Sequence, residues 1–323
     1  MKKVLIATIL LVIGGTAFAQ KHKSAQELKI VKPIKLNGVN DITISGDEIT
    51  GDDLDCIQLT NCKNIHITHC RLISSKGFGV RLWKCSNILI DSNYMGDVRA
   101  GVYAQDCPDG GIRVNYNAML NMQGPFPQAS FVQFNHVGGP NNRICYNKLE
   151  NEPGKSHPED AINVYKSNGV EGDPILIDSN WIKGGSSPSG AGVTLGDQGG
   201  SYQVAQNNII INTGAGGMQI AGGNHIQIIN NSIFGKAFPY SHVGLGYGNW
   251  SGQPSTDITI SGNKVRWVSG KPQDQRDGST TREFNVSFQR SAGKPNGWDT
   301  NVLNADIDEN MKPVINLKLK EVK

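Results

Sequence analysis

The sequence has no large excess of charge of either sign. Its 31 Lys and Arg residues against 28 Asp and Glu residues give a formal net charge of +3. Proteins that bind nucleic acids by bulk charge carry a much stronger basic excess. The composition therefore predicts no nucleic-acid partner, and any preference for an anion must come from a local patch.

Long apolar runs and long helical patterns are also missing. After residue 19 no stretch approaches the ~20 apolar residues that a membrane helix needs, so no membrane insertion is expected. We also find no capped segment of about ten residues with helical 3.6-residue periodicity. With 39 glycines and abundant Asn, the chain is expected to be all-β.

The first 19 residues have the pattern of a secretory signal. Lys2 and Lys3 precede the apolar run Val4–Ile13, and Ala17-Phe18-Ala19 fits a cleavage site for signal peptidase. The predicted division is residues 1–19 as signal peptide, 20–38 as lead-in and cap, 39–311 as repeat, and 312–323 as a charged edge strand or tail. This pattern predicts a secreted or periplasmic protein. We also expect the protein to be a monomer.

A repeat with a minimum period of 23 residues is the strongest signal. The template apolar-x-apolar-x-x-Asn-x-apolar matches ILIDSNYM (88–95), IRVNYNAM (112–119), ILIDSNWI (175–182), IQIINNSI (226–233) and ITISGNKV (258–265). Such a period is typical of a parallel β-helix, in which each coil stacks ~4.8 Å from the next. The spacing predicts a single parallel β-helix of about nine to ten rungs. The predicted turn column contains Asn93, Asn117, Asn147, Asn180, Asn207, Asn231 and Asn263.

Three cysteines follow the same period. Cys62, Cys85 and Cys107 are 23 and 22 residues apart and fall on successive rungs. In an oxidising compartment two of them can form a disulfide, and a ladder of buried thiols explains the spacing equally well. No Cys-x-x-Cys or Cys/His pattern indicates zinc.

A second strand follows each template copy, and its outward residues are expected to form columns. One column reads Gln58, Arg81, Tyr103, Gln133, Asn163, Thr194 and Gln219. The next reads Thr60, Trp83, Gln105, Asn135, Tyr165, Gly196 and Ala221. The residues just beyond include His136, Lys166, Asp197, Tyr247 and Arg290. The stretch SHPEDAINVYKSN (156–168) gathers Asp, Asn, Tyr and Lys at one outward edge, beside loops long enough to wall a groove.

These rungs resemble the right-handed parallel β-helix group that includes pectate lyases and other polysaccharide lyases and hydrolases. More narrowly, PEDAINVYKS, SGAGVTLGDQGGSYQVAQNN and GMQIAGGNHIQIINN resemble a family of single-domain alginate (polymannuronate) lyases. The resemblance covers most of the chain, but rung repeats specify a fold and not a reaction. It implies a lyase that cleaves an acidic polysaccharide, with alginate favoured.

β-Elimination needs a group that neutralises the uronate carboxylate, a base and an acid. Lys166 or Arg81, with Asn135 or Asn163, are predicted as neutralisers, and Tyr165, Tyr103 or His136 as base and acid. Gln133, Asp160, Asp197, Tyr247 and Arg290 are predicted to bind substrate. No cofactor is expected, because Asp160 and Asp197 are too few for a convincing Ca²⁺ cage, although Ca²⁺ binding stays open.

Two other classes of function stay open. A glycoside hydrolase on the same fold needs two carboxylates facing one site, and Asp160 with Asp197 can supply them. A noncatalytic glycan-binding β-helix needs neither. Each predicted site residue also has a purely structural interpretation, as an outward sheet residue or a turn residue; their co-location on consecutive rungs is what favours a site.

Overall fold

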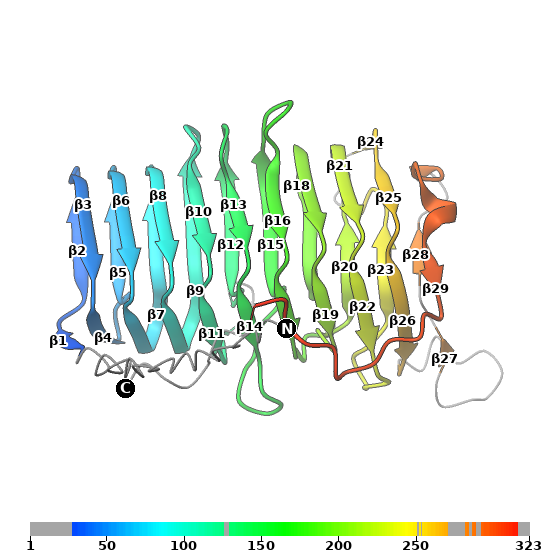
Figure 1. The fold of residues 1–323 in the computed structure, drawn as a ribbon, viewed down its shortest axis with the longest axis horizontal. Helices are drawn as coiled ribbons and strands as arrows, with labels where there is room; N and C mark the ends of the chain where they lie inside the picture. Colours follow the sequence, from blue (N-terminus) through cyan, green and yellow to red (C-terminus); the bar gives the residue numbers. More distant parts are fainter. Residues whose placement is uncertain are drawn as a thin grey trace, which may run out of the picture.

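The chain forms one continuous coil of short parallel strands, with rungs stacked along the longest axis of the molecule (Figure 1). The computed structural model describes residues 28–125, 129–250, 252, 254–270, 282–283, 286–288 and 292–315. No helix in these residues is long and apolar enough to span a bilayer. The predicted signal peptide lies outside them. The prediction of an all-β parallel β-helix is confirmed.

The template repeat supplies two of the three sheets, because the chain turns at the Asn column. The first sheet contains β3 (Asn40–Ser45), β6 (Lys63–Thr68), β8 (Ser86–Asp91), β10 (Ile112–Asn115), β13 (Arg143–Cys145), β16 (Ile175–Asp178), the end of β18 (Ala191–Gln206), β21 (Gly223–Ile229), β24 (Ser255–Thr256) and β25 (Thr259–Ser261).

The second sheet follows the turn. It contains β1 (Lys29–Val31), β4 (Asp47–Asp52), the starts of β7 (Arg71–Trp83) and β9 (Tyr94–Cys107), β11 (Ala118–Leu120), β14 (Lys148–Glu150), β17 (Trp181–Lys183), β19 (Ile209–Ile211), β22 (Ser232–Gly235), β26 (Lys264–Ser269) and β29 (Val302–Leu303). The short β27 (Arg282–Glu283) pairs antiparallel with β26.

The third sheet is built from the predicted second strands. It contains β2 (Ile34–Asn37), β5 (Ile57–Thr60), the ends of β7 and β9, β12 (Val132–Val137), β15 (Ile162–Asn168), the start of β18, β20 (Gly216–Ile220), β23 (Val243–Tyr247) and β28 (Val286–Phe288). These ten levels match the predicted rung number. Because β1 and β2 already pair with β4 and β5, the coil begins inside the segment predicted as lead-in.

Inward side chains of all three sheets form one apolar core. On the third sheet Val80, Leu82, Val102, Val132 and Phe134 are fully buried, whereas the residues that alternate with them point outward. Each buried side chain of this size contributes about 1.5–3 kcal/mol relative to exposure. The core therefore fixes which residues of β12, β15 and β18 reach the outer face.

A buried amide ladder closes the turn between the first and second sheets. In each step the Asn side-chain N–H group bonds the Asn side chain of the next rung and a backbone carbonyl of the preceding rung. Asn147 Nδ2, for example, donates to Asn180 Oδ1 at 2.9 Å and to Val114 O at 2.8 Å. The members are Asn93, Asn117, Asn147, Asn180, Asn208, Asn231, Asn263 and Asn301.

The prediction of Asn207 in this ladder was wrong by one residue. Asn207 has a φ of 54° and an exposed side chain that bonds Asp178, whereas Asn208 is buried and bonds Asn231. The left-handed residue of each turn is the one before the ladder Asn, such as Ser179 before Asn180. Asn suits both the left-handed position and the ladder position. The repeat template could therefore be aligned with either Asn207 or Asn208 in the ladder.

The six cysteines, which include Cys62, Cys85 and Cys107, are free and buried. Burial raises the pKa of the Cys85 thiol to about 11 and that of the Cys107 thiol to about 12. Of the two interpretations that the spacing left open, the structure has the ladder of buried thiols.

The C-terminal segment runs back along the coil instead of forming a further rung. Figure 1 shows it passing from β29 beneath β26, β22 and β19. Trp181 Nε1 donates to Met311 O at 2.9 Å, and Ile307 and Met311 pack on a cluster with Ile211 and Phe234. Asn301 completes the ladder, so residues 305–311 are the part of the predicted repeat that leaves the coil. This segment covers part of the second sheet and leaves the third sheet open.

Candidate functional site

A cavity of about 360 Å³ lies on the outer face of the third sheet, over β12, β15 and β18. It is lined by Ser130, Gln133, Asn135, Glu159, Asp160, Asn163, Tyr165 and Asp197. Six of these residues were predicted from the sequence as site residues: Gln133, Asn135, Asp160, Asn163, Tyr165 and Asp197. Their columns follow from strand register, since Gln133 pairs with Asn163 and Asn135 with Tyr165.

A β-bulge brings Asp197 into the cavity. The register shifts after Asn163, so that Tyr165 pairs with Asp197 and not with Gly196, as the predicted column had it. Gly196 has a φ of +60° and donates its N–H to Gln203 Oε1 at 2.9 Å. A side chain there would meet Gly222 O. The extra residue turns Asp197 outward beside Tyr165.

Asp160 is the buried anchor of the site. Its Oδ1 accepts hydrogen bonds from Ala191 N at 2.7 Å and Thr194 Oγ1 at 2.8 Å, and its Oδ2 accepts one from Asn163 Nδ2 at 2.7 Å. Burial raises the pKa of Asp160 to about 6, against the lowering effect of these donors. Asp160 therefore fixes Asn163 in place.

Asn163 connects two carboxylates. Its Nδ2 also donates to Asp197 Oδ2 at 3.0 Å. Only 5% of Asn163 is exposed, and its Oδ1 has no hydrogen-bond donor among the described residues; the same is true of the buried Gln133 Oε1. Buried acceptors are normally paired, and these two oxygens are exceptions in the part of the chain that the structure describes.

Glu159 is the carboxyl group that sequence reasoning missed. It lies half-buried at the cavity wall, where its Oε1 accepts a hydrogen bond from Ser189 Oγ at 3.1 Å. Burial, and then the nearby charges of Asp160 and Asp197, raise its pKa to about 7. The sequence shows the acidic pair Glu159-Asp160 directly before a predicted strand. It does not show which of the two side chains is fully buried and which is only partly buried.

The predicted cations lie outside this cavity. Lys166 has a φ of 46°, so the chain turns there and its exposed side chain reaches the outer face, with Nζ 5.3 Å from the centre of the Tyr165 ring. The His136 ring packs edge-on against Tyr165 at 6.0 Å between centroids, and its Nδ1 lies 2.7 Å from Asn135 Oδ1. Both residues border the site without lining it.

Two further predicted residues, Tyr103 and Arg81, have other surroundings. Tyr103 is 4% exposed, stacks on Phe78, and its hydroxyl accepts a hydrogen bond from Asn135 Nδ2 at 2.8 Å. Arg81 lies over the Phe78 ring, with NH1 3.9 Å from Asp55 Oδ2, two rungs from Gln133. These two residues support the neighbouring rungs and do not line the cavity.

Tyr247 is a core residue and not a substrate ligand. It points inward, is 3% exposed, and donates its hydroxyl to Ala292 O at 2.7 Å. The placement in an outward column was wrong because Tyr247 pairs with the buried Ile220, an inward residue of β20. Its neighbour Gly246 is the outward partner of Gln219. Arg290 lies outside the described residues.

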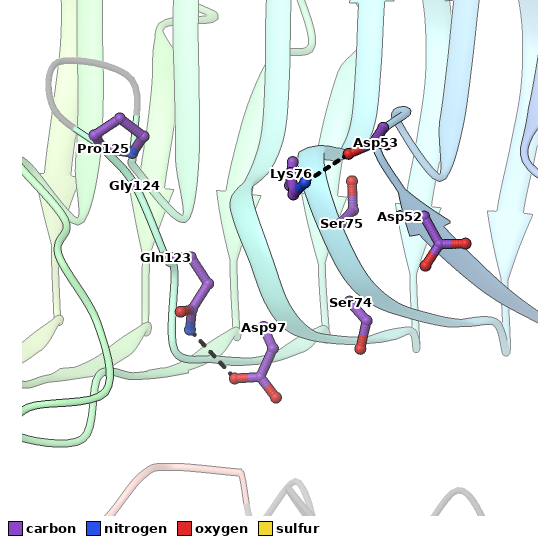
Figure 2. A pocket seen from close by; sticks show the side chains of 9 residues that line it. All are labelled: Asp52, Asp53, Ser74, Ser75, Lys76, Asp97, Gln123, Gly124 and Pro125. Carbon is purple, nitrogen blue, oxygen red and sulfur yellow. Dashed lines mark hydrogen bonds and ion pairs between the residues drawn. The ribbon is translucent and has the colours of Figure 1, made fainter.

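Two of the larger cavities elsewhere bring together fewer groups that could act on a substrate. Figure 2 shows one of about 620 Å³, where Lys76 pairs with Asp53 at 2.8 Å and Gln123 bonds Asp97 at 3.3 Å. The other, about 850 Å³, is lined by parts of the loops predicted to wall a groove, and its Lys236 pairs with Glu309 at 2.6 Å. Neither combines partly buried carboxyls with unpaired amide oxygens as the third-sheet cavity does.

Within the described residues, no three His, Cys, Asp or Glu side chains are arranged to hold a metal ion. The carboxylates of the third-sheet cavity are instead directed at protein donors on Asn163, Ala191, Thr194 and Ser189. What the arrangement offers is a carboxyl group that stays protonated to near-neutral pH, a second carboxylate beside it, and amides that can bind hydroxyl groups.

The family model for a right-handed β-helix region matches residues 33–265. The chain belongs to the right-handed β-helix family. No curated protein sequence matches it. This right-handed β-helix resembles three solved structures. The first is the catalytic unit of a thermostable GH87 α-1,3-glucanase from Streptomyces thermodiastaticus (12% identity, TM-score 0.42, 87% of this chain and 52% of that one).

The second is a mutant of the periplasmic alginate epimerase AlgG (12% identity, TM-score 0.40, 85% of this chain and 75% of that one). The third is PfbA, a surface adhesin of Streptococcus pneumoniae (10% identity, TM-score 0.40, 82% and 75%). The chain spans about half the length of the glucanase unit. A fold does not specify a reaction, so the function has to be argued from the site.

Proposed function

We propose that the protein is a glycoside hydrolase that cleaves a polysaccharide in the third-sheet cavity. The observation that carries the proposal is that Glu159, whose pKa is raised to about 7, lines one cavity with a second half-buried carboxyl group, that of Asp197. Glycosidases use two carboxyl groups in unequal environments, one to protonate the leaving oxygen and one to act at the anomeric carbon. Glu159 takes the first role and Asp197 the second.

Asp160 serves as a positioning residue in this scheme. It is buried, and both of its oxygens accept hydrogen bonds from the protein. By holding the Asn163 amide it also orients the hydrogen bond to Asp197. The sequence-based hydrolase alternative paired Asp160 with Asp197; the geometry favours Glu159 as the acid, because Glu159 is the more exposed of the two acidic neighbours.

The cavity also offers groups that suit sugar hydroxyls. Gln133, Asn135 and Asn163 present side-chain amides on two adjacent rungs, and two of their oxygens have no donor among the described residues. Hydroxyl groups donate and accept, so a sugar can bind the polar side chains that line the cavity without bringing charge into it. The amides would bind the sugar while the carboxyl groups act on the glycosidic bond.

A lyase that cleaves a uronate polymer such as alginate by β-elimination is the second candidate. It is favoured by Tyr165, a phenol that lines the cavity between Lys166 and His136. Such a reaction requires the substrate carboxylate to be neutralised, and three carboxyl groups in the same cavity oppose the approach of an anion. We therefore rank it below hydrolysis.

We further propose that the protein acts outside the cytoplasm, as a monomer and without a metal cofactor. The export proposal is supported by the signal-like pattern of residues 1–19. A polysaccharide too large to cross a membrane would be met in that location.

The test is a product assay on neutral and acidic polysaccharides. A hydrolase releases reducing ends without the ultraviolet absorbance of an unsaturated uronate; a lyase gives both, and a binding protein gives neither. Glu159→Gln is the inactive variant, and Glu171→Gln, an exposed Glu on a loop outside the cavity, is the matched control. New reducing ends that carry the unsaturated chromophore would replace the proposal by the second candidate.

A further inference from the structure

An exposed tryptophan lies on the third sheet on the N-terminal side of the cavity. Trp83 is 43% exposed. From one rung to the next, Trp83 pairs with Gln105, Gln105 with Asn135, and Asn135 with Tyr165. Trp83 therefore lies in the same outward column as Tyr165, three rungs away from it. The indole is held in place, because Nε1 donates to Asp106 Oδ2 at 3.2 Å and Lys84 Nζ lies 4.9 Å from the ring centre.

A second exposed tryptophan lies on the C-terminal side of the cavity. Trp250 is 46% exposed, and its ring lies against Gly246, where an added Cβ would meet Trp250 Cη2 at 2.7 Å. Gly246 continues the outward column of Asn163, Thr194 and Gln219, again three rungs away. The missing side chain at position 246 is what allows an indole to lie on the sheet.

The surface between the two indoles is polar and follows the rungs. Apart from Tyr103 and the tyrosine and carboxyl groups of the cavity, its outward residues are amides and one hydroxyl: Gln105, Gln133, Asn135, Asn163, Thr194 and Gln219. Of the C-terminal segment, Ile307 and Met311 pack on residues of the second sheet. Flat aromatic rings flanking a row of amides suit a sugar chain, whose rings present apolar C–H faces and polar edges.

We infer that a neutral polysaccharide lies along the third sheet, parallel to the coil axis, with Trp83 and Trp250 as stacking platforms on opposite sides of the cavity. The inference rests on the proposed function for what happens at the centre of the strip. Six rung spacings separate the two levels, about 29 Å. An extended pyranose unit is about as long as one rung spacing, about 5 Å, so the strip holds about six sugar units. The chain is therefore cut internally.

The test is affinity electrophoresis through native gels that contain laminarin, xylan, alginate or polygalacturonate. A neutral polysaccharide should retard the wild-type protein, and Trp83→Ala and Trp250→Ala should each raise the Kd at least about fivefold, the scale of a lost aromatic contact. Trp83→Phe and Trp250→Phe should restore part of the binding. Tyr116→Ala is the control, because Tyr116 is an exposed aromatic that stacks on Tyr146 at the turn between β10 and β11.

Chain length separates two platforms from one. An oligosaccharide of two or three units is too short to reach both indoles, so at most one of the two Trp→Ala variants should bind it more weakly than the wild type. An oligosaccharide of eight units can reach both, so both variants should bind it more weakly. Retardation only in the acidic gels, or wild-type mobility of both Trp→Ala variants whose thermal unfolding is unchanged, would overturn the inference. If the protein binds with this pattern but forms no product, the binding strip between Trp83 and Trp250 is supported and the hydrolase proposal is refuted. Products of mainly intermediate length would support the binding strip and the hydrolase proposal together.

Discussion

Tyr165 and Asp197 are paired residues on neighbouring strands β15 and β18, although 32 positions separate them in the chain. The bulge at Gly196 produces this pairing, since without it Gly196 would face Tyr165. The one additional residue in β18 thus places the Asp197 side chain in the cavity, where it accepts a hydrogen bond from Asn163.

The pH dependence of turnover should reveal Glu159. Because its pKa is raised to about 7, the acid form is present below that pH and is lost above it. The wild-type kcat/KM is therefore expected to fall as the pH rises through about 7. Glu159→Gln should lower kcat/KM at least ~10²-fold and abolish this alkaline limb. The Glu171→Gln protein should keep both the rate and the limb; an unchanged limb in Glu159→Gln would assign the proton to another group.

Asp160 should make stability fall as the pH rises. Its pKa is raised from 3.8 to about 6 in the folded protein, so its favourable contribution is fully present below pH 4 and is lost as the pH rises through about 6. The change amounts to about 3 kcal/mol. Thermal unfolding from pH 4 to 7.5 should show that Asp160→Asn lacks this decrease relative to wild type. Parallel curves for the two proteins would contradict it.

Lys166→Ala separates the two candidate reactions. Lys166 contacts the Tyr165 ring but does not line the cavity, so hydrolysis should lose less than ~10-fold in kcat. The lyase predicted from the sequence needs its charge, and there the loss should reach at least ~10²-fold. The measurement is kcat of the folded variant on the polysaccharide identified in the product assay. A large loss would favour elimination.

The amide ladder should be costly to interrupt. Asn180 accepts two hydrogen bonds from Asn147 and donates to Ile144 O and Asn208 Oδ1, all within the buried turn. Asn180→Ala leaves several buried groups unpaired, at about 1–3 kcal/mol each, so urea unfolding should show a loss of about 3 kcal/mol or more. Asn207→Gly is the control: it keeps the left-handed backbone and removes only an exposed side chain, and should change stability by less than about 1 kcal/mol.

Chelation is expected to leave turnover unchanged. The oxygens of Asp160 and the Oε1 of Glu159 are already bonded to protein donors, and the proposed acid needs no metal. Activity after EDTA treatment and dialysis, compared with untreated protein, is the measurement. A loss that Ca²⁺ restores would show that a cation neutralises the cavity, and would favour the lyase.

The sequence by itself determined the fold and most of the residues that line the third-sheet cavity. The 23-residue minimum period requires identical strands to stack, and alternation along each strand decides which residues face outward. That was sufficient to place Gln133, Asn135, Asn163 and Tyr165 on adjacent rungs. The same pattern could not separate Asn207 from Asn208, because Asn suits both the left-handed turn and the ladder.

Only the tertiary structure decided the chemistry of the cavity. A bulge changes the register without leaving a periodic signal, and it placed Asp197 beside Tyr165. Burial depends on loops that the repeat does not describe: Ser189, from the loop before β18, reaches Glu159, whose raised pKa follows from partial burial beside Asp160 and Asp197. Adjacent residues in sequence, Glu159 and Asp160, thereby receive different roles. Strand periodicity fixes where side chains point, but the charge state of each depends on how much water and which neighbours surround it.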